Sequence, residues 1–205
     1  MARIVFIGPT WQRRNALLGS LDHHQVVARI SSAKSALRHL QVQQFDLLVV
    51  ELALDDIHGL ELVEILRQRN QLDPAIPVLI ISHLDSALNI HRAAAWGAAG
   101  FLPMADCRAR LQAVLDAIAQ GNTVFPAYSR STLEQDERLR CAQEFSTRQV
   151  AVVHGLSQGR TLSSLANLMS VTVSNVSYFK RKTMQALHAA SQDEMIQLSQ
   201  DIGLI

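Results

Sequence analysis

Residues 46–52, Asp46-Leu47-Leu48-Val49-Val50-Glu51-Leu52, form the stretch that decides the fold of this chain. Its central residues are all apolar, which is typical of a strand buried on both faces rather than of a strand with one wet face. Strands of that kind lie inside parallel sheets, because the crossover helices cover both faces of such a sheet. The stretch therefore predicts the inner strand of a parallel sheet.

Four other short apolar runs are predicted as strands, at residues 3–7, 25–30, 78–82 and 100–102. Helix patterns separate them. Leu60, Val63 and Leu66 share one side of a helix, and so do the residues of a second pattern, Leu111, Leu115 and Ile118. Strands that alternate with helices predict a doubly wound α/β domain with a five-stranded parallel sheet. Regulatory or ligand chemistry is then expected at the carboxyl ends of the strands.

Length and composition narrow the class of protein. The chain has 205 residues, 48% hydrophobic and 18% charged, which is enough for two domains with packed cores. Its two cysteines, Cys107 and Cys141, lack CxxC spacing, which argues against a disulfide scaffold or a cysteine zinc site and fits a reducing compartment. No apolar run reaches the roughly 18 residues of a membrane span. We therefore expect a cytoplasmic protein without a membrane segment.

The second half of the chain follows a different pattern. Residues 121–143 contain Gly121, Pro126 and a mixed-charge run, and are predicted as a linker that becomes helical after Ser131. From Phe145 onward the pattern is helical only. Four helix starts carry N-cap residues, two of them as capping boxes with Gln149 and Glu194. These N-cap residues are Ser146, Thr161, Thr172 and Ser191.

The distribution of charge points to DNA. Residues 1–124 hold 11 basic and 11 acidic side chains, whereas residues 145–192 hold five basic and no acidic ones. A short helix, a tight turn and a longer helix with a basic run are the parts of a helix-turn-helix. A buried stripe on the longer helix is expected at Val176, Phe179, Thr183 and Leu187. The alternative is a solvated basic face on an ordinary helical bundle.

The opposite side of that helix then carries the candidate DNA contacts. Ser174, Ser177, Tyr178, Arg181 and Gln185 lie there, and Arg181 is suited to bidentate contact with guanine. Lys180 and Lys182 flank this side and are expected to contact phosphates.

Residues 145–205 resemble the LuxR-type four-helix DNA-binding domain that ends NarL/FixJ response regulators. The resemblance is carried by FSTRQ at residues 145–149, LSQG at 156–159, VTVSNV at 171–176 and DIGL at 201–204. It implies double-stranded DNA as a partner, a homodimer, and base reading by Ser177, Tyr178 and Arg181. We expect Met195, Leu198 and Ile202 of the last helix to pair the subunits.

The first part of the chain resembles a response-regulator receiver domain. FDLLVV at residues 45–50, LDDIHGLE at 54–61 and GAAGFL at 97–102 carry this resemblance. It implies a flavodoxin-like fold. The predicted domains are a receiver over residues 1–123, a linker over 124–143 and a helix-turn-helix domain over 144–205.

Receiver domains of this family carry a phosphorylation site, and this chain lacks most of the residues that form it. A working receiver has an acidic pair after the first strand, an aspartate after the third, a hydroxyl after the fourth and a lysine after the fifth. Here the acidic pair is replaced by Gly8-Pro9, the acceptor is Glu51, the hydroxyl is Ser82 and the lysine position is Met104. Without the carboxylates and the lysine, Mg²⁺ and phosphate binding should fall steeply.

Two interpretations of Glu51 stay open. Its longer side chain imitates a phosphorylated aspartate, or it is a polar strand-end residue without a role in signalling. Asp55 and Asp56 are expected in a solvated loop, with a weak metal site as the alternative. His23 and His24 are weak metal candidates, because adjacent strand residues point to opposite faces. Cys107 is expected to be packed rather than redox-active.

These observations predict a DNA-binding transcriptional regulator that works without phosphorylation, with no cofactor and no bound metal. Its receiver would serve dimerisation or partner binding through the fourth helix, fifth strand and fifth helix of the family fold. The alternative is a protein-interaction regulator whose receiver sequesters another regulator. Ser82, His83 and Asp85 show no nucleophile-elbow motif, and nothing in the sequence supports an enzyme.

Overall fold

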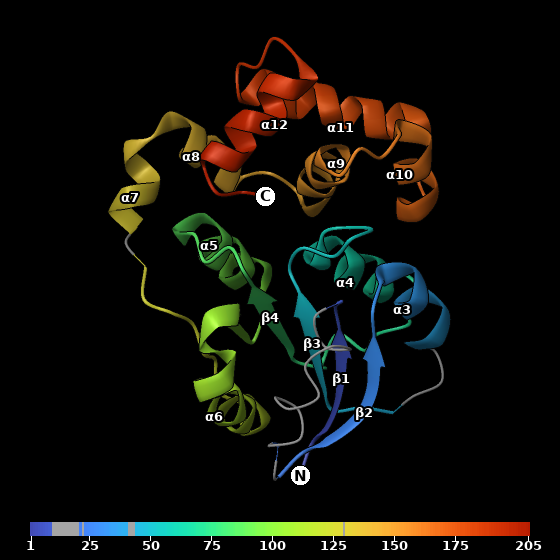
Figure 1. The fold of residues 1–205 in the computed structure, drawn as a ribbon, viewed down its shortest axis with the longest axis vertical. Coiled ribbons are helices and arrows are strands. Elements are labelled where there is room, and N and C mark those ends of the chain that lie inside the picture. The colour runs from blue at the N-terminus through green and yellow to red at the C-terminus, as the bar shows by residue number, and fades with distance from the viewer. Residues whose placement is uncertain (10–20, 22, 41–43, 129) are drawn as a thin grey trace. The chain divides into compact units, whose positions relative to one another are not determined.

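The computed structural model describes residues 1–9, 21, 23–40, 44–128 and 130–205 (Figure 1). The chain forms two compact units. The first comprises Met1–Asp85 and Ala93–Ala127, and the second comprises Ser86–Arg92 and Tyr128–Ile205.

The first unit is built on a five-stranded parallel sheet in the order β2-β1-β3-β4-β5. The strands are β1 (Arg3–Ile7), β2 (Gln25–Ile30), β3 (Leu47–Glu51), β4 (Val78–Ser82) and β5 (Gly100–Pro103). This confirms the predicted flavodoxin-like sheet, with β3 in the centre. Three strands match their predicted bounds. The third is one residue shorter at each end, and the fifth extends to Pro103.

The inner strands of the sheet are buried on both faces, which explains the continuous apolar run of β3. All five residues of β3 and of β4 are buried. On one face Ile4, Phe6, Leu47 and Val49 belong to a core cluster with the apolar side of α6 (Cys107–Ala119). The other helices of the sheet region are α3 (Ala33–His39) and α4 (Gly59–Gln68), with a 3-10 turn at Met104–Asp106. Helix α5 (Ala87–Trp96) is divided between the units, because its residues up to Arg92 belong to the second. The predicted helix sides of α4 and α6 are indeed buried.

The second unit contains six further helices among the described residues. They are α7 (Arg130–Gln135), α8 (Glu137–Gln143), α9 (Thr147–Ser157), α10 (Leu162–Met169), α11 (Val173–Ala186) and α12 (Gln192–Asp201). The predicted helical linker thus contains two short helices. The last four helices are those that the N-cap pattern predicted.

The caps form as their chemistry predicts. Ser146 and Gln149 make a reciprocal capping box at the start of α9. The hydroxyls of Thr161, Thr172 and Ser191 accept backbone N–H groups three residues later. At the start of α12, the Glu194 carboxylate accepts the backbone N–H of Ala190 at 2.7 Å, and not the backbone N–H of the cap residue Ser191 that the predicted capping box requires.

Close packing of α9 on α10 positions the helix-turn-helix. Gly155, in the middle of α9, faces Leu165 of α10, whose side chain is fully buried. A Cβ at Gly155 would overlap the Leu165 side chain, so a larger residue there would force this buried side chain to move. On the other side of α9, the Gln149 amide donates to the Thr183 hydroxyl of α11 at 3.4 Å. These contacts hold α10 and α11 as one unit with α9.

Candidate DNA-binding face and receiver pocket

The second helix of the helix-turn-helix, α11, follows α10 through a three-residue turn, Ser170 to Thr172. Ser170 adopts the left-handed conformation, with φ 56°, and ends α10. The Thr172 hydroxyl then accepts the N–H of Asn175 at 3.2 Å and starts α11. This reversal is short because only Val171 separates the residue that ends α10 from the residue that caps α11.

One side of α11 is packed and the other is open. Val176, Thr183 and Leu187 are fully buried, which confirms most of the predicted stripe. The prediction that Phe179 belongs to this buried stripe is wrong, because Phe179 is only half-buried. Its ring lies edge-on to the ring of Tyr178, with 5.6 Å between the ring centroids. The sequence-predicted DNA contacts all lie on α11: Ser174, Ser177, Tyr178, Lys180, Arg181 and Lys182. Ser174, Arg181 and Lys182 are exposed, and Tyr178 is 52% exposed.

The open side of α11 contains a hollow with polar and basic walls. It has a volume of about 470 Å³ and is lined by Val173, Ser174, Ser177, Lys180 and Arg181. Hydroxyl and guanidinium groups of this kind can bond base edges, and ammonium groups can contact phosphates. The sequence had not marked Val173, which is 44% exposed at the first position of α11.

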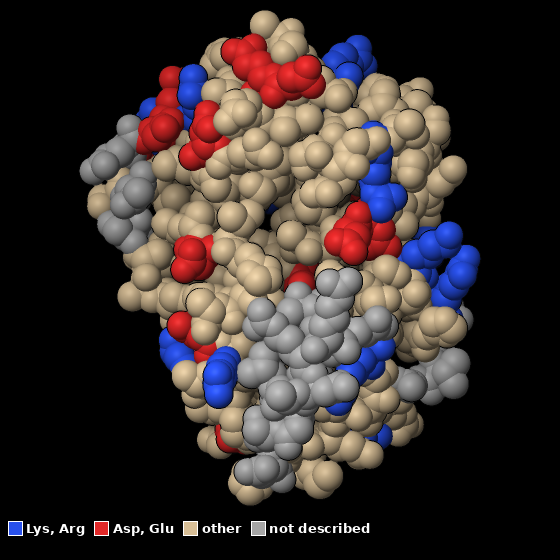
Figure 2. Space-filling view, viewed as in Figure 1, with Lys and Arg blue, Asp and Glu red and all other residues tan. Residues whose placement is uncertain are grey.

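The basic side chains of α11 are available to a ligand. Lys180, Arg181 and Lys182 form no ion pair with any residue in the described ranges. Elsewhere charge is mixed, and Figure 2 shows acidic and basic side chains in small separate groups on the face that it presents. Attraction to an anionic polymer is therefore concentrated on a short segment.

The receiver pocket lies at the carboxyl ends of β1, β3 and β4, where Gly8, Glu51 and Ser82 come together in the topology. Glu51 ends β3 and is only 4% exposed. Its side chain lies over the backbone of Gly8, since a Cβ added at Gly8 would overlap the Oε1, Cδ and Cγ atoms of Glu51. The Glu51 carboxyl therefore occupies the space in which the first residue of an acidic pair would place its side chain.

The other pocket residues are also engaged. The Ser82 hydroxyl is buried and accepts the N–H of Leu84 at 2.9 Å, which stabilises the turn after β4. Met104, which the sequence predicts at the position of the family's lysine, is 3% exposed and belongs to the core cluster beneath α6. Its thioether offers no positive charge to a phosphate.

The loop after β3 departs from the sequence expectation. Asp56 was expected to be solvated, which is wrong, because it is buried and its two carboxylate oxygens accept the N–H groups of Ala33 and Lys34 at 2.9 and 2.8 Å. Asp56 therefore caps α3 from a distant part of the chain. Asp55 is exposed. His58 and Glu61, which the sequence analysis did not mark, are buried at 3% and 0% exposure.

The weaker candidates have structural roles. His24 accepts the N–H of Ala2 through Nδ1, and its Nε2 lies 3.0 Å from Asp116 Oδ1. A hydrogen bond from Gln112 is the main cause that lowers the pKa of Asp116. Cys107 is 1% exposed, as expected for a packed thiol. Within the described ranges, no three His, Cys, Asp or Glu side chains are grouped to hold a metal ion.

The residues expected at the dimer interface do not share one environment. Met195 is fully buried inside the second unit, so its place in a dimer interface is wrong. Leu198 and Ile202 are half-buried. Met195 is instead the apolar residue through which α12 packs on the core of its own unit.

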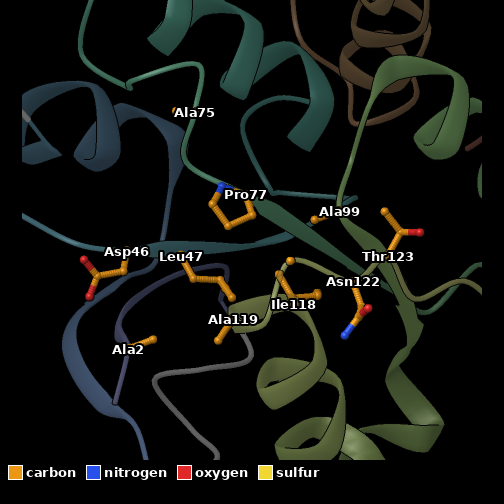
Figure 3. A pocket seen from close by; sticks show the side chains of 11 residues that line it. Ala2, Asp46, Leu47, Ala75, Pro77, Ala99, Ile118, Ala119, Asn122 and Thr123 are labelled. Carbon is orange, nitrogen blue, oxygen red and sulfur yellow. The ribbon is translucent and has the colours of Figure 1, made fainter.

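A separate cavity of about 360 Å³ opens at the amino ends of the strands, far from Glu51 along β3 (Figure 3). Ala2, Leu47, Pro77 and Ile118 give it a largely apolar lining. Its Asp46 carboxylate is bound by the Arg3 guanidinium at 2.8 Å, and this hydrogen bond lowers the pKa of Asp46 to about 2. The cavity is therefore unrelated to the pocket of the receiver resemblance. No helix among the described residues is long and apolar enough to cross a membrane.

Comparison with known proteins identifies the family. The response regulator receiver domain family matches residues 12–115. This chain belongs to the response regulator receiver family. The DNA-binding transcriptional activator EvgA of Escherichia coli K12 is 21% identical over 180 residues, covering 86% of this chain and 85% of EvgA. BvgA of Bordetella pertussis is 25% identical over 158 residues, covering 75% of this chain and 74% of BvgA.

Solved structures of another response regulator share the fold over nearly the whole chain. RcsB of Salmonella typhimurium aligns with a TM-score of 0.72 at 13% identity, covering 98% of each chain. RcsB of Salmonella enterica serovar Typhimurium bound to the promoter rprA aligns with a TM-score of 0.69 at 13% identity, covering 96% of this chain and 97% of RcsB. The response regulator described here thus has the receiver fold followed by the helical domain of such proteins.

Proposed function

We propose that this response regulator is a transcriptional regulator that binds double-stranded DNA as a homodimer through α11. The observation that carries the proposal is the open side of α11, where Ser174, Tyr178 and Arg181 are exposed opposite a buried stripe. In this proposal residues 1–123 are the receiver, 124–143 the linker and 144–205 the DNA-binding domain. Because it would act on chromosomal DNA, we place it in the cytoplasm.

Two further facts support DNA as the ligand. Residues 145–192 carry five basic and no acidic side chains, so the segment attracts a polyanion. EvgA is named as a DNA-binding transcriptional activator, and RcsB has been solved on promoter DNA.

The test separates base contacts from phosphate contacts. Duplexes are first selected by the wild-type protein from a random library, and affinities are then measured between 50 and 200 mM salt. We expect Arg181→Ala to weaken the selected site by about 1–3 kcal/mol and to relax base preference. Lys182→Ala should weaken all sequences alike and flatten the salt slope by about one unit. Equal losses on specific and random DNA for Arg181→Ala would contradict its role as a base reader.

We also propose that regulation does not use phosphorylation of the receiver. The support is the Glu51 carboxyl packed over Gly8, together with Met104 in the core where a phosphate-binding lysine would stand. An incoming phosphoryl group would meet neither an acidic pair at Gly8-Pro9 to hold Mg²⁺ nor a lysine at Met104. The receiver then serves dimerisation or the binding of a protein partner.

Phosphotransfer measures this directly. The protein is incubated with acetyl phosphate or phosphoramidate and Mg²⁺, beside a response regulator with an aspartate acceptor as positive control. We expect intact-mass spectra of this protein to show no added phosphate. Stable, Mg²⁺-dependent incorporation at a receiver residue would overturn the proposal.

A further inference from the structure

Val173 is a large apolar side chain that is left in solvent at the start of α11. It is the first residue of the helix, directly after the Thr172 cap, and is 44% exposed. The helix packs through a different side, where Val176 and Leu187 are fully buried. Val173 therefore leaves much of its apolar surface open on the helix that also exposes Tyr178, and a ligand that covers this surface would gain apolar contact.

The surroundings of Val173 fit a base edge. It lines the hollow of α11 together with Ser174, Ser177, Lys180 and Arg181, so its methyl groups lie among hydroxyl donors and cations. Residues in the first turn of a helix-turn-helix recognition helix are those that reach base edges. In the major groove, thymine is the base that presents a methyl group, and aliphatic side chains contact it.

We propose that Val173 contacts a thymine 5-methyl group in each half-site and so determines part of the base preference. This inference rests on the proposed function, and it adds a non-polar reader to the polar residues that the sequence marked. The contact involves no charge, so its loss should leave the salt dependence of binding unchanged.

The experiment removes the methyl group from either partner. The probe is a duplex selected from a random library by the wild-type protein, in which each thymine is replaced in turn by deoxyuridine. At one thymine position in each half-site, we expect the replacement to weaken wild-type binding about fourfold. This factor is the effect of one buried methyl-sized group. Val173→Ala should weaken the thymine duplex by a similar factor and should bind both duplexes equally.

Ser177→Ala is the matched control, because it alters the same hollow without touching the aliphatic contact. It should keep the wild-type ratio between thymine and uracil duplexes. A ratio that persists in Val173→Ala would overturn the inference, as would a wild-type protein that binds every uracil duplex like the parent. If the wild type selects no duplex at all, the proposed function itself fails. Selective binding without a methyl effect refutes only the role of Val173.

Discussion

The overlap between Gly8 and Glu51 predicts an energetic coupling between two residues far apart in sequence. Gly8→Ala adds a Cβ at a φ of 153° and drives it into the buried Glu51 carboxyl. The backbone strain costs about 1–3 kcal/mol, and the overpacking costs a further 1–3 kcal/mol or so. Glu51→Ala removes the atoms that the Cβ meets. The double variant should therefore be about 1–3 kcal/mol more stable than the sum of the single effects predicts.

Hydrogen exchange is the suitable assay, because a chain of two units need not unfold in one step. Protection of β1 and β3 amides gives the free energy of opening of the sheet in the full chain. Gly97→Ala is the control. Its φ is 91° and an added Cβ meets no atom within 4 Å, so it carries strain without overlap. The effect of Gly97→Ala on the free energy of opening should be additive with the effect of Glu51→Ala. Additivity within about 0.5 kcal/mol for Gly8→Ala and Glu51→Ala would refute the packing described here.

Three other results are expected. Gly155→Ala should destabilise the helical unit in thermal melts, because overpacking of about 1–3 kcal/mol against buried Leu165 exceeds the ~1 kcal/mol gain in helix propensity; a raised melting temperature would contradict this. The lowered pKa of Asp46, about 2 against 3.8, means that its pairing with Arg3 stabilises the fold above about pH 4 and is lost as the pH falls toward 2. The urea midpoints of wild type and Arg3→Gln should therefore differ at pH 5, and the difference should be clearly smaller at pH 2.5, because the contribution of the pair declines toward the folded pKa of about 2. A constant difference would argue against this pair. Glu51→Gln, which keeps the shape of the side chain, should leave affinity for the selected duplex unchanged within about twofold; a tenfold loss would indicate that the charge of Glu51 is a standing signal.

Local sequence signals were sufficient for the elements of both units. The strands at residues 3–7, 25–30 and 78–82 have the predicted bounds. The first and the last of them are short apolar runs that the sheet buries almost completely, whereas 25–30 is a partly exposed edge strand. The helix starts at Ser146, Thr161, Thr172 and Ser191 were readable because an N-cap hydrogen bond spans only three residues. The same short range explains why the prediction of the buried and open sides of α11 was largely correct.

Side-chain environments that depend on distant residues were not readable in this way. Asp56 was assigned to a solvated loop, yet it caps α3, which lies more than twenty residues earlier. Met195 has the spacing of an interface residue and is instead fully buried in its own unit. An apolar stripe predicts that one side of a helix will be buried, but the periodicity does not show whether the same chain or a second copy buries it.

The sequence by itself determined the order of the strands, the helix caps and the separation of a neutral half from a basic segment, and it predicts the loss of the receiver's acidic pair and lysine. Only the tertiary structure decided where the Glu51 carboxyl lies, which groups Asp56 binds, and that Val173 is left exposed. The physical reason is one of range. Backbone propensity and capping act over three or four residues, whereas burial and overlap depend on which distant segments the folded sheet and helices bring into contact.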